Sequence, residues 1–195
     1  MNATTLPSKT DASLQRLADW AVILITVVAV LIGWLIKDGV QNRNVPFSAS
    51  GISAQTPAGW LATKAQDNEI LHVSDPLSSG FGTTYTLQSI PVATDATVDQ
   101  VVSALILQRG QSLNTFRVLE QQQVTISGRA AYEISYVYVE SNPNLTHNEI
   151  PNIVQGLDYI FLNGDHAIVA TYWADENEYK SDLGRFHQFL SSLKF

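Results

Sequence analysis

The sequence predicts an α+β protein in which an antiparallel sheet packs between helices, preceded by one transmembrane helix. Three observations lead to this prediction. Residues 20–36 form a run of seventeen residues without a charged side chain. From residue 47 onward, short segments of alternating apolar and polar residues are typical of strands. Two longer segments, residues 97–110 and 175–193, place apolar residues three and four positions apart, as amphipathic helices do.

The apolar run predicts a transmembrane helix at residues 17–37, after an N-terminal tail at residues 1–16. Twenty helical residues span about 30 Å, the thickness of the hydrocarbon core of a bilayer. Trp20 and Trp34 stand near the two ends, where indole rings favour the headgroup region, and Lys37 marks a water boundary. A buried core helix without a polar face would need protein on every side, which so small a domain cannot supply.

A cleaved signal peptide is the alternative to a retained helix. Signal peptides have apolar regions of about 7–15 residues, followed closely by small residues at the cleavage site. The nearest such triplet, residues 48–50, lies well beyond the run. Basic residues flank the helix equally, Lys9 and Arg16 before it and Lys37 and Arg43 after it, so their count does not set its orientation. The short N-terminal tail favours a cell-membrane protein whose domain lies outside the cytoplasm.

Residues 38–46 are polar and end at Pro46, so they predict a linker to a domain at residues 47–195. This domain has seven Lys and Arg against fifteen Asp and Glu, a net charge of −8. Such a charge is repelled by phosphate backbones and anionic lipid surfaces, so nucleic acid is not an expected partner. The chain has no cysteine, which excludes disulfides, thiolate metal sites and cysteine nucleophiles.

The first strands of the domain are short. Residues 52–55 form an extended run that stops at a turn before Trp60, a predicted core residue. Residues 70–73 predict a second strand. Residues 83–90 predict a third, whose continuation is weakened by Pro91.

A helix is predicted next. Thr97 and Gln100 have the spacing of a capping box, which satisfies the first free N–H groups of a helix. Gly110 predicts the end of this helix. Its apolar residues share one face, so the helix should lie on the sheet: Val98, Val101, Val102, Leu105 and Ile106.

Two hairpins follow. The first joins residues 116–126 to residues 131–139 through Ser-Gly-Arg, and the second joins residues 157–162 to residues 167–173 through Asn-Gly-Asp. One strand of the first hairpin sends these large side chains to one side: Tyr132, Ile134, Tyr136 and Tyr138.

Between the hairpins, residues 140–155 form a polar segment with two prolines and four asparagines. Loops of this length are usually functional, so Asn144, His147 and Glu149 are candidate interaction residues. Asp175 predicts the cap of a last helix. The apolar face of that helix is expected to contain Tyr179, Leu183, Phe186, Leu190 and Leu193.

The sequence contains no G-x-S-x-G, P-loop, H-E-x-x-H or G-x-G-x-x-G pattern, and its four histidines have no zinc-ligand spacing. We therefore predict no catalytic residue, no cofactor and no metal ligand. Two cation sites are weaker hypotheses. One pairs His147 with Glu149, and the other combines a helix-terminal cluster with a distant carboxylate: Asp175, Glu176 and Glu178 with Asp165 or Asp158. The many aromatic residues predict core packing, with an exposed docking patch as the alternative.

Three stretches together are similar to the signature stretches of the PsbP-like family. They read ISAQTPAGW at residues 52–60, VTISGRAAYEISYVYVE at residues 124–140, and a closing hairpin–helix unit at residues 156–195. The resemblance implies an α/β/α sandwich with a central antiparallel sheet. It also implies an accessory, assembly or binding role, since most members of the family are not enzymes. The predicted anchor departs from the photosystem subunits of the family, and no functional residue is carried over.

The sequence therefore favours a membrane-anchored, non-catalytic accessory or assembly subunit of a membrane protein complex, of photosynthetic or respiratory type. Its expected partners are the other subunits of that complex and the lipid bilayer. The alternative is a tethered module of the cell envelope that binds a ligand or a divalent ion.

Overall fold

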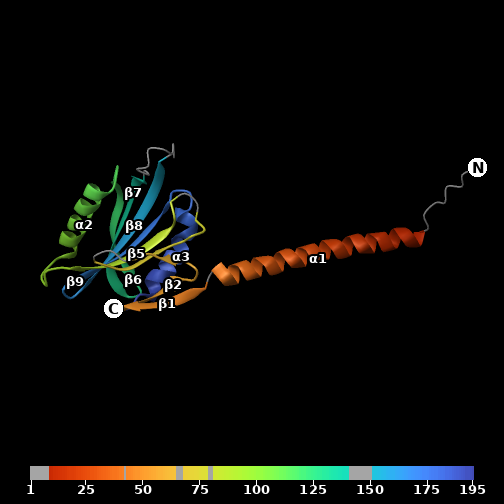
Figure 1. The fold of residues 1–195 in the computed structure, drawn as a ribbon, viewed down its shortest axis with the longest axis horizontal. Helices are drawn as coiled ribbons and strands as arrows, with labels where there is room; N and C mark the ends of the chain where they lie inside the picture. Colours follow the sequence, from red (N-terminus) through yellow and green to blue (C-terminus); the bar gives the residue numbers. More distant parts are fainter. Residues whose placement is uncertain (1–8, 42, 65–67, 79–80, 141–150) are drawn as a thin grey trace, which may run out of the picture. The chain divides into compact units, whose positions relative to one another are not determined.

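The computed structural model describes residues 9–41, 43–64, 68–78, 81–140 and 151–195. The chain divides into two compact units, Met1–Arg43 and Asn44–Phe195. The first contains helix α1, Lys9–Gln41 (Figure 1). On this helix the side chains of residues 19–35 are described, and all of them are exposed.

The transmembrane helix predicted at residues 17–37 lies inside α1. Over the described residues, no helix combines the length and the hydropathy that crossing a membrane requires. The membrane-spanning role of this segment stays a prediction.

The second unit is built on a seven-stranded antiparallel sheet with the strand order β3-β4-β5-β9-β8-β7-β6. The strands are β3 (Leu61–Ala62), β4 (Glu69–Ser74), β5 (Thr84–Pro91), β6 (Arg117–Ile126), β7 (Arg129–Glu140), β8 (Asn152–Asn163) and β9 (His166–Asp175). A separate antiparallel hairpin consists of β1 (Asn44–Ala49) and β2 (Ile52–Pro57). Two helices complete the unit, α2 (Val98–Ser112) and α3 (Tyr179–Ser192).

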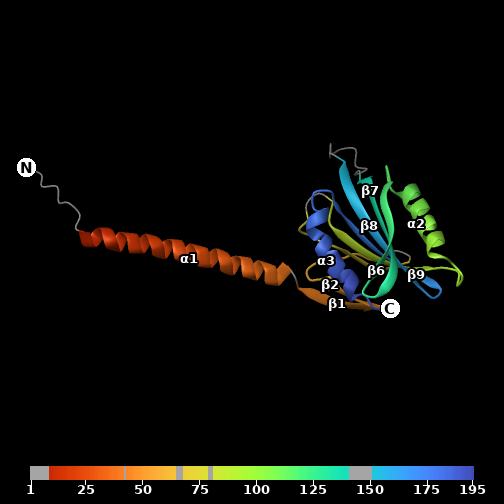
Figure 2. The ribbon, with the colours of Figure 1, turned by 180° about the vertical axis from the view of Figure 1, so that it is seen from behind.

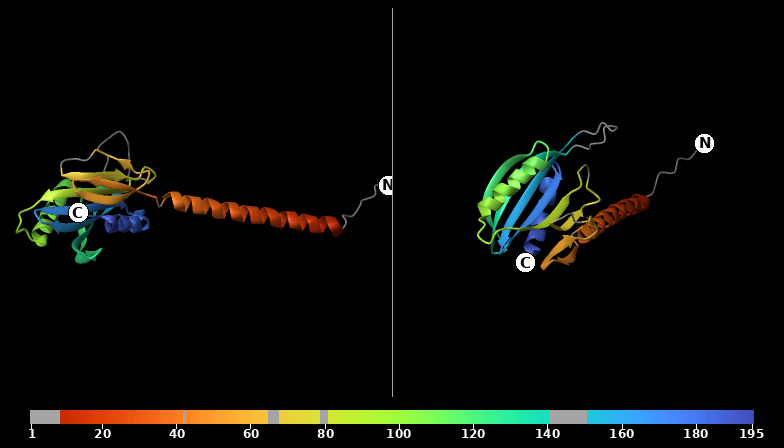
Figure 3. Two further views of the ribbon diagram at one scale, coloured as in Figure 1. Left: turned by 90° about the horizontal axis from the view of Figure 1, so that it is seen from below. Right: turned by 60° about the vertical axis from the view of Figure 1, so that its left-hand side comes forward.

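The two helices cover opposite faces of the sheet, with α2 on one side and α3 on the other (Figures 1 and 3). The β1–β2 hairpin lies beside α3 (Figure 2), and a backbone bridge joins Ser53 of β2 to Lys194 just after α3. Strands β8 and β9 are buried on both faces because a helix covers each. The predicted α/β/α sandwich with a central antiparallel sheet is confirmed.

Two hydrophobic cores lie on the two faces. The α3 side contains Tyr85, Tyr172 and Phe186, and the α2 side contains Ile134 and Tyr136. Burial of each large apolar side chain contributes roughly 1.5–3 kcal/mol, so these clusters are the main stabilising contribution in this unit. Trp60, predicted as a core residue, is half-buried and packs on Tyr85 with the ring centroids 4.4 Å apart.

The structure differs from the prediction at both ends of the linker predicted at residues 38–46. Helix α1 continues to Gln41, and β1 already begins at Asn44. Strand β1 includes Pro46, the residue at which the predicted linker ends. Proline is tolerated there because β1 pairs with β2 alone and so has one unpaired edge.

The end of α2 and the start of α3 also differ from the prediction. Helix α2 has the predicted capping box at Thr97 but runs two residues past Gly110, ending where the Leu113 N–H donates to the Arg109 carbonyl. Asp175 does not cap α3. It is the last residue of β9, its carboxylate accepts a hydrogen bond from the Asn177 N–H, and the cap residue is Glu178.

The predicted loop at residues 140–155 is shorter than expected at its C-terminal end. Strand β8 begins at Asn152 and pairs with β7 up to Glu140, opposite Asn152. The start of this strand is not apparent in the sequence because Asn152 and Gln155 are polar. Hydropathy alone does not report the backbone pairing that forms a strand.

Candidate functional site

The residues predicted to anchor the chain lie on α1. Trp20 is 72% exposed and Trp34 is 62% exposed. Lys37 belongs to the same helix, and its side chain lies outside the described part. The candidate interaction residues of the long loop also lie outside the described residues: Asn144, His147 and Glu149.

The weaker hypothesis of a cation site around the start of the last helix is not supported by the structure. Asp165 and Asp175 stand at opposite ends of β9, which places them roughly 30 Å apart at about 3.3 Å per residue. Asp158 is 1% exposed and bonded to Arg109. Among the residues that the structure describes, no three His, Asp or Glu side chains gather as metal ligands.

The tyrosines of the sheet pack in the core, as the sequence predicted. Tyr136, Tyr138, Tyr159 and Tyr172 are all buried. Trp173, half-buried, contacts Tyr138 edge-on. The alternative of an exposed aromatic docking patch is not supported for these residues.

A buried polar network connects α2 to the sheet. Arg109, from the last turn of α2, donates to Asp158 of β8 through Nε at 3.3 Å and Nη2 at 3.4 Å, and Nη2 also reaches Thr171 Oγ1 at 3.1 Å. Asp158 Oδ1 accepts from the Thr171 hydroxyl at 2.6 Å and from the Tyr136 hydroxyl at 3.2 Å. The Trp173 indole N–H donates to the Tyr136 hydroxyl at 2.7 Å.

The electrostatics of this network keep Tyr136 and Arg109 protonated. Burial, together with the adjacent Asp158 carboxylate, raises the pKa of Tyr136 well above its usual value. Burial alone would lower the pKa of Arg109, but the Asp158 charge, its hydrogen bond to Arg109 and the neighbouring Tyr136 and Tyr138 together outweigh burial, and the pKa is raised. Every charge has an opposite partner, so the network positions α2 and offers no free group for chemistry.

Sequence reasoning missed this pair, although a signal for it exists. Arg109 continues the spacing of Val102 and Leu105 along the buried face of α2, where a charge is out of place. Asp158 interrupts an apolar run in β8 in the same way. Two opposite charges at core positions predict a buried ion pair, because an unpaired buried charge is too costly.

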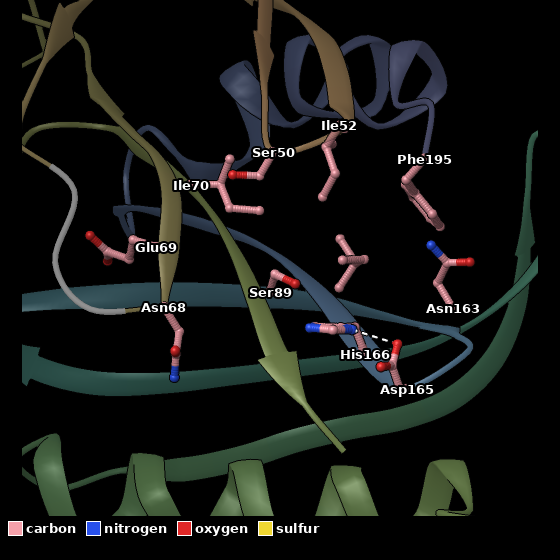
Figure 4. A pocket seen from close by; sticks show the side chains of 12 residues that line it. Ser50, Ile52, Asn68, Glu69, Ile70, Ser89, Asn163, Asp165, His166 and Phe195 are labelled. Atoms are coloured by element: carbon pink, nitrogen blue, oxygen red, sulfur yellow. Dashed lines mark hydrogen bonds and ion pairs between the residues drawn. The ribbon is translucent and has the colours of Figure 1, made fainter. Parts of the chain in front are cut away.

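The candidate site is a cleft of about 570 Å³ at one end of the sheet (Figure 4). Its walls come from the β1–β2 turn, the start of β4, the end of β5, the β8–β9 turn and the C-terminal residue. Figure 4 shows their side chains around a common space. The polar lining consists of Ser50, Asn68, Glu69, Ser89, Asn163, Asp165 and His166, and the apolar lining of Ile52, Ile70, Ile168 and Phe195.

Backbone geometry brings these distant segments together. Ser50 and Gly51 both have positive φ, 51° and 77°, as the tight turn between β1 and β2 requires. In the β8–β9 turn, Gly164 has φ 66° and allows Asp165 and His166 to stand side by side. The Val92 N–H donates to the Asp165 carbonyl at 2.9 Å, which ties this turn to the end of β5.

Two carboxylate–imidazole pairs lie at the cleft. His166 Nδ1 is 2.7 Å from Asp165 Oδ1, and this hydrogen bond lowers the pKa of the Asp165 carboxyl. His72 Nδ1 is 3.2 Å from Glu69 Oε2. The Asp165 carboxylate therefore stays ionised near neutral pH, and the lining contains no Lys or Arg.

The cleft does not have the arrangement of an activated nucleophile. Ser89 lines it together with Asp165 and His166, but within the described residues no hydrogen bond joins the Ser89 hydroxyl to the His166 ring. A serine nucleophile needs that contact to lose its proton. The geometry offers a binding surface of acceptors around an apolar floor.

No family model matches the chain, and no curated protein matches it. Solved structures do. Cyanobacterial PsbP from Synechocystis superposes with a TM-score of 0.57 at 13% identity, covering 77% of this chain and 91% of that one. The Ran-binding protein Mog1p of Saccharomyces cerevisiae superposes with a TM-score of 0.50 at 9% identity, covering 78% and 95%. LpqN of Mycobacterium tuberculosis, a protein involved in cell envelope biogenesis, superposes with a TM-score of 0.50 at 12% identity, covering 82% and 95%.

At these identities the likeness concerns the fold alone. The chain has a PsbP/Mog1-like fold, which confirms the family resemblance at the level of architecture. The neighbours name no residue of this chain.

Proposed function

We propose that this chain is a membrane-tethered, non-catalytic accessory or assembly subunit whose domain docks on a membrane protein complex outside the cytoplasm. The observation that carries the proposal is the exposure of α1. Its large apolar side chains are exposed on every face, from 44% at Val28 to 72% at Trp20. Exposed apolar surface of this extent marks a protein or membrane contact.

A bilayer suits this segment for physical reasons. A helix satisfies its own backbone hydrogen bonds, which lipid cannot do for it. The apolar run from Trp20 to Ile36 has a tryptophan near each end, at the depth where indole rings prefer to lie. Adsorption of the domain to anionic lipid is unfavourable at a net charge of −8 for residues 44–195, with seven basic and fifteen acidic residues, so a separate anchor is needed.

The accessory role is supported by the fold and by the cleft. Solved structures with this fold include cyanobacterial PsbP, a Ran-binding protein and a protein involved in cell envelope biogenesis. The cleft joins acceptors to an apolar floor without an activated nucleophile. The complex served can be photosynthetic or respiratory, and the sequence favours neither.

Extraction of native membranes with alkaline carbonate tests the tether. The full chain should stay in the membrane pellet. Val27→Asp combined with Val28→Asp places two charges at the middle of the run, each costing about 2.5–3.5 kcal/mol at a helix centre, and should release the chain. The control, Val27→Ile with Val28→Ile, should stay in the pellet. Release of the unaltered chain by carbonate would contradict the tether.

Purification in a mild detergent tests the accessory role. An N-terminal affinity tag on the full chain avoids Phe195, which packs against the core. Mass spectrometry should identify membrane subunits in constant ratio to the chain. A chain that purifies alone from solubilised native membranes would overturn the proposal.

A tethered module for a ligand or divalent ion is the second candidate, favoured by the cleft itself. Asp165, His166 and Glu69 are ligand types that metals use. Thermal unfolding of the full chain with Ca²⁺, Mn²⁺ or Zn²⁺ decides the question, because an ion that binds the folded state raises the midpoint. An unchanged midpoint with all three ions removes the ion-binding form of this candidate.

A further inference from the structure

We infer that the cleft at the end of the sheet receives a basic side chain, an arginine or a lysine, presented by the protein on which the domain docks. The inference rests on the proposed docking role and identifies the cleft as one place where the domain contacts its partner. Three properties of the cleft support it: the sign of its charge, its apolar floor, and the acceptors along its rim.

The negative charge of the cleft disfavours anionic ligands. Glu69 and Asp165 are the charged lining residues, and no Lys or Arg lines the cleft. The whole unit from Asn44 to Phe195 has the same sign, with seven Lys and Arg against fifteen Asp and Glu. Such a field attracts a cationic surface and speeds its encounter. The nearby Arg129 lies over the Phe195 ring at 4.3 Å and does not line the cleft.

The floor of the cleft suits the methylene stem of a basic side chain. Ile52 and Ile168 are 4% and 2% exposed and line the cleft together with Ile70 and Phe195. Figure 4 shows Ile52, Ile70 and Phe195 around it. Long cationic side chains bury their stems against such surfaces while their heads stay polar. A volume of about 570 Å³ accommodates one side chain with the adjoining backbone.

The rim supplies acceptors for the cationic head. His166 Nδ1 is held by Asp165 at 2.7 Å, and Figure 4 shows the other ring nitrogen directed away from Asp165. In the neutral imidazole this second nitrogen is an acceptor. The side-chain carbonyl groups of Asn68 and Asn163 add two more. A guanidinium has five N–H donors and an ammonium three, so both can use several of these acceptors together.

A metal ion fits the same cleft less well. Stable sites for divalent ions use several protein ligands at short distances. Nowhere in the described part of the chain do three such ligands converge. Both carboxylates of the cleft are already bonded to histidines, at 2.7 and 3.2 Å.

Nuclear magnetic resonance of the full chain in detergent micelles, with labelled histidine rings, tests the inference. The probe is N-acetyl-arginine amide. It should shift the His166 ring signals saturably. N-acetyl-citrulline amide, which has the same shape without the charge, should not.

Variants locate the binding in the cleft. Asp165→Asn and Glu69→Gln should each weaken arginine binding about threefold to fivefold, the effect of losing one partly exposed charge pair. Asp95→Asn removes the same charge from an exposed loop outside the cleft and should bind like the unaltered chain.

Several outcomes would overturn the inference. They are equal binding of the citrulline probe, no saturable shift of His166, undiminished binding by Asp165→Asn and Glu69→Gln, and displacement of the arginine probe by Ca²⁺, Mn²⁺ or Zn²⁺. The proposed function is tested separately by carbonate extraction and co-purification. Arginine binding without co-purified subunits would refute the accessory role alone, whereas co-purified subunits without arginine binding would refute this contact alone.

Discussion

At the scale of single residues, the buried pair of Arg109 and Asp158 sets the position of α2. The guanidinium reaches across from the helix to β8 and is also stacked over the Trp173 ring, 5.0 Å from its centroid. Both charges are removed from water, at 8% and 1% exposure. At a buried position, an ion pair contributes little more to stability than well-packed apolar side chains do. One unpaired buried charge, in contrast, is severely destabilising.

Asp158→Asn should lower the free energy of unfolding by about 3–5 kcal/mol, because it leaves the Arg109 charge buried without a counter-charge. Urea denaturation followed by tryptophan fluorescence measures this loss. The exposed Asp95→Asn is the matched control and should change stability by about 0.5 kcal/mol at most.

The combined replacement of Arg109→Met and Asp158→Leu separates charge from packing. It should recover most of the loss, since neither charge remains. Recovery stays incomplete because the Tyr136 and Thr171 hydroxyls lose their acceptor. If Asp158→Asn alone cost less than about 1 kcal/mol, the pair would have to be solvated, contrary to the structure.

Gly156 is required by its neighbour Tyr136 on the paired strand. A β-carbon at residue 156 would collide with the Tyr136 ring, which lies directly over the glycine. Gly156→Ala should therefore cost about 1–3 kcal/mol and weaken the hydrogen bond from Trp173 to the Tyr136 hydroxyl. Thermal unfolding together with tryptophan fluorescence of the folded state measures both effects.

Gly184→Ala is the control for this substitution. Gly184 lies within α3, and a β-carbon there meets no atom within 4 Å. Because alanine is favoured over glycine in a helix interior, the free energy of unfolding should stay unchanged or rise by about 0.5–1 kcal/mol. Equal losses at both glycines would contradict a specific role for the Tyr136 contact.

At the scale of elements, the two helices of the sandwich begin differently. Helix α2 has a complete capping box, in which the Gln100 N–H donates to the Thr97 hydroxyl and the Thr97 N–H to the Gln100 side chain. Helix α3 begins at Tyr179, and its cap residue Glu178 makes no side-chain cap bond. Its position depends instead on the apolar contacts of Phe186 and Phe189, both almost fully buried.

Thr97→Ala should lower the free energy of unfolding by about 1 kcal/mol, because it removes the hydroxyl that caps α2. Urea denaturation measures the change. Thr97→Ser retains the hydroxyl and should keep most of the stability. A loss of similar size for serine and alanine would assign the effect to the threonine methyl group and not to the cap.

At the scale of the whole molecule, the chain consists of two units with separate physical requirements. Over the described residues, both cores of the sandwich consist of residues of Asn44–Phe195. Helix α1 has exposed apolar side chains throughout its described part. The sandwich therefore has the core of an independent domain, and α1 is proposed as its tether.

A chain that begins at Asn44 should be soluble without detergent and unfold in a single transition at the midpoint of the full chain, because no core residue is lost. Calorimetry measures the midpoint, and light scattering measures solubility. A chain that begins at Ile52 is the control: it lacks β1 and the Phe47 contact with the core, and its midpoint should fall. Aggregation of the longer chain would show that α1 supports the fold.

The sequence by itself determined the helices and most strands of the sandwich, though not β1 and β3, and the apolar character of α1. Periodicity and turn residues report local structure directly, as the capping box at Thr97 and the turn at Gly164 illustrate. Boundaries were less well predicted. Asp175 resembles a helix cap but ends a strand, since pairing with Val154 outweighs its local preference.

The tertiary structure alone decided which segments, distant in the sequence, come into contact. The cleft joins the β1–β2 turn, the start of β4 and the β8–β9 turn, and the buried pair joins Arg109 to Asp158 across 49 positions of sequence. No local pattern encodes such contacts, because they depend on how strands far apart in the chain are ordered in one sheet. The composition limited the charge of the cleft's occupant, whereas folding alone placed Glu69, Asp165 and His166 around one apolar floor.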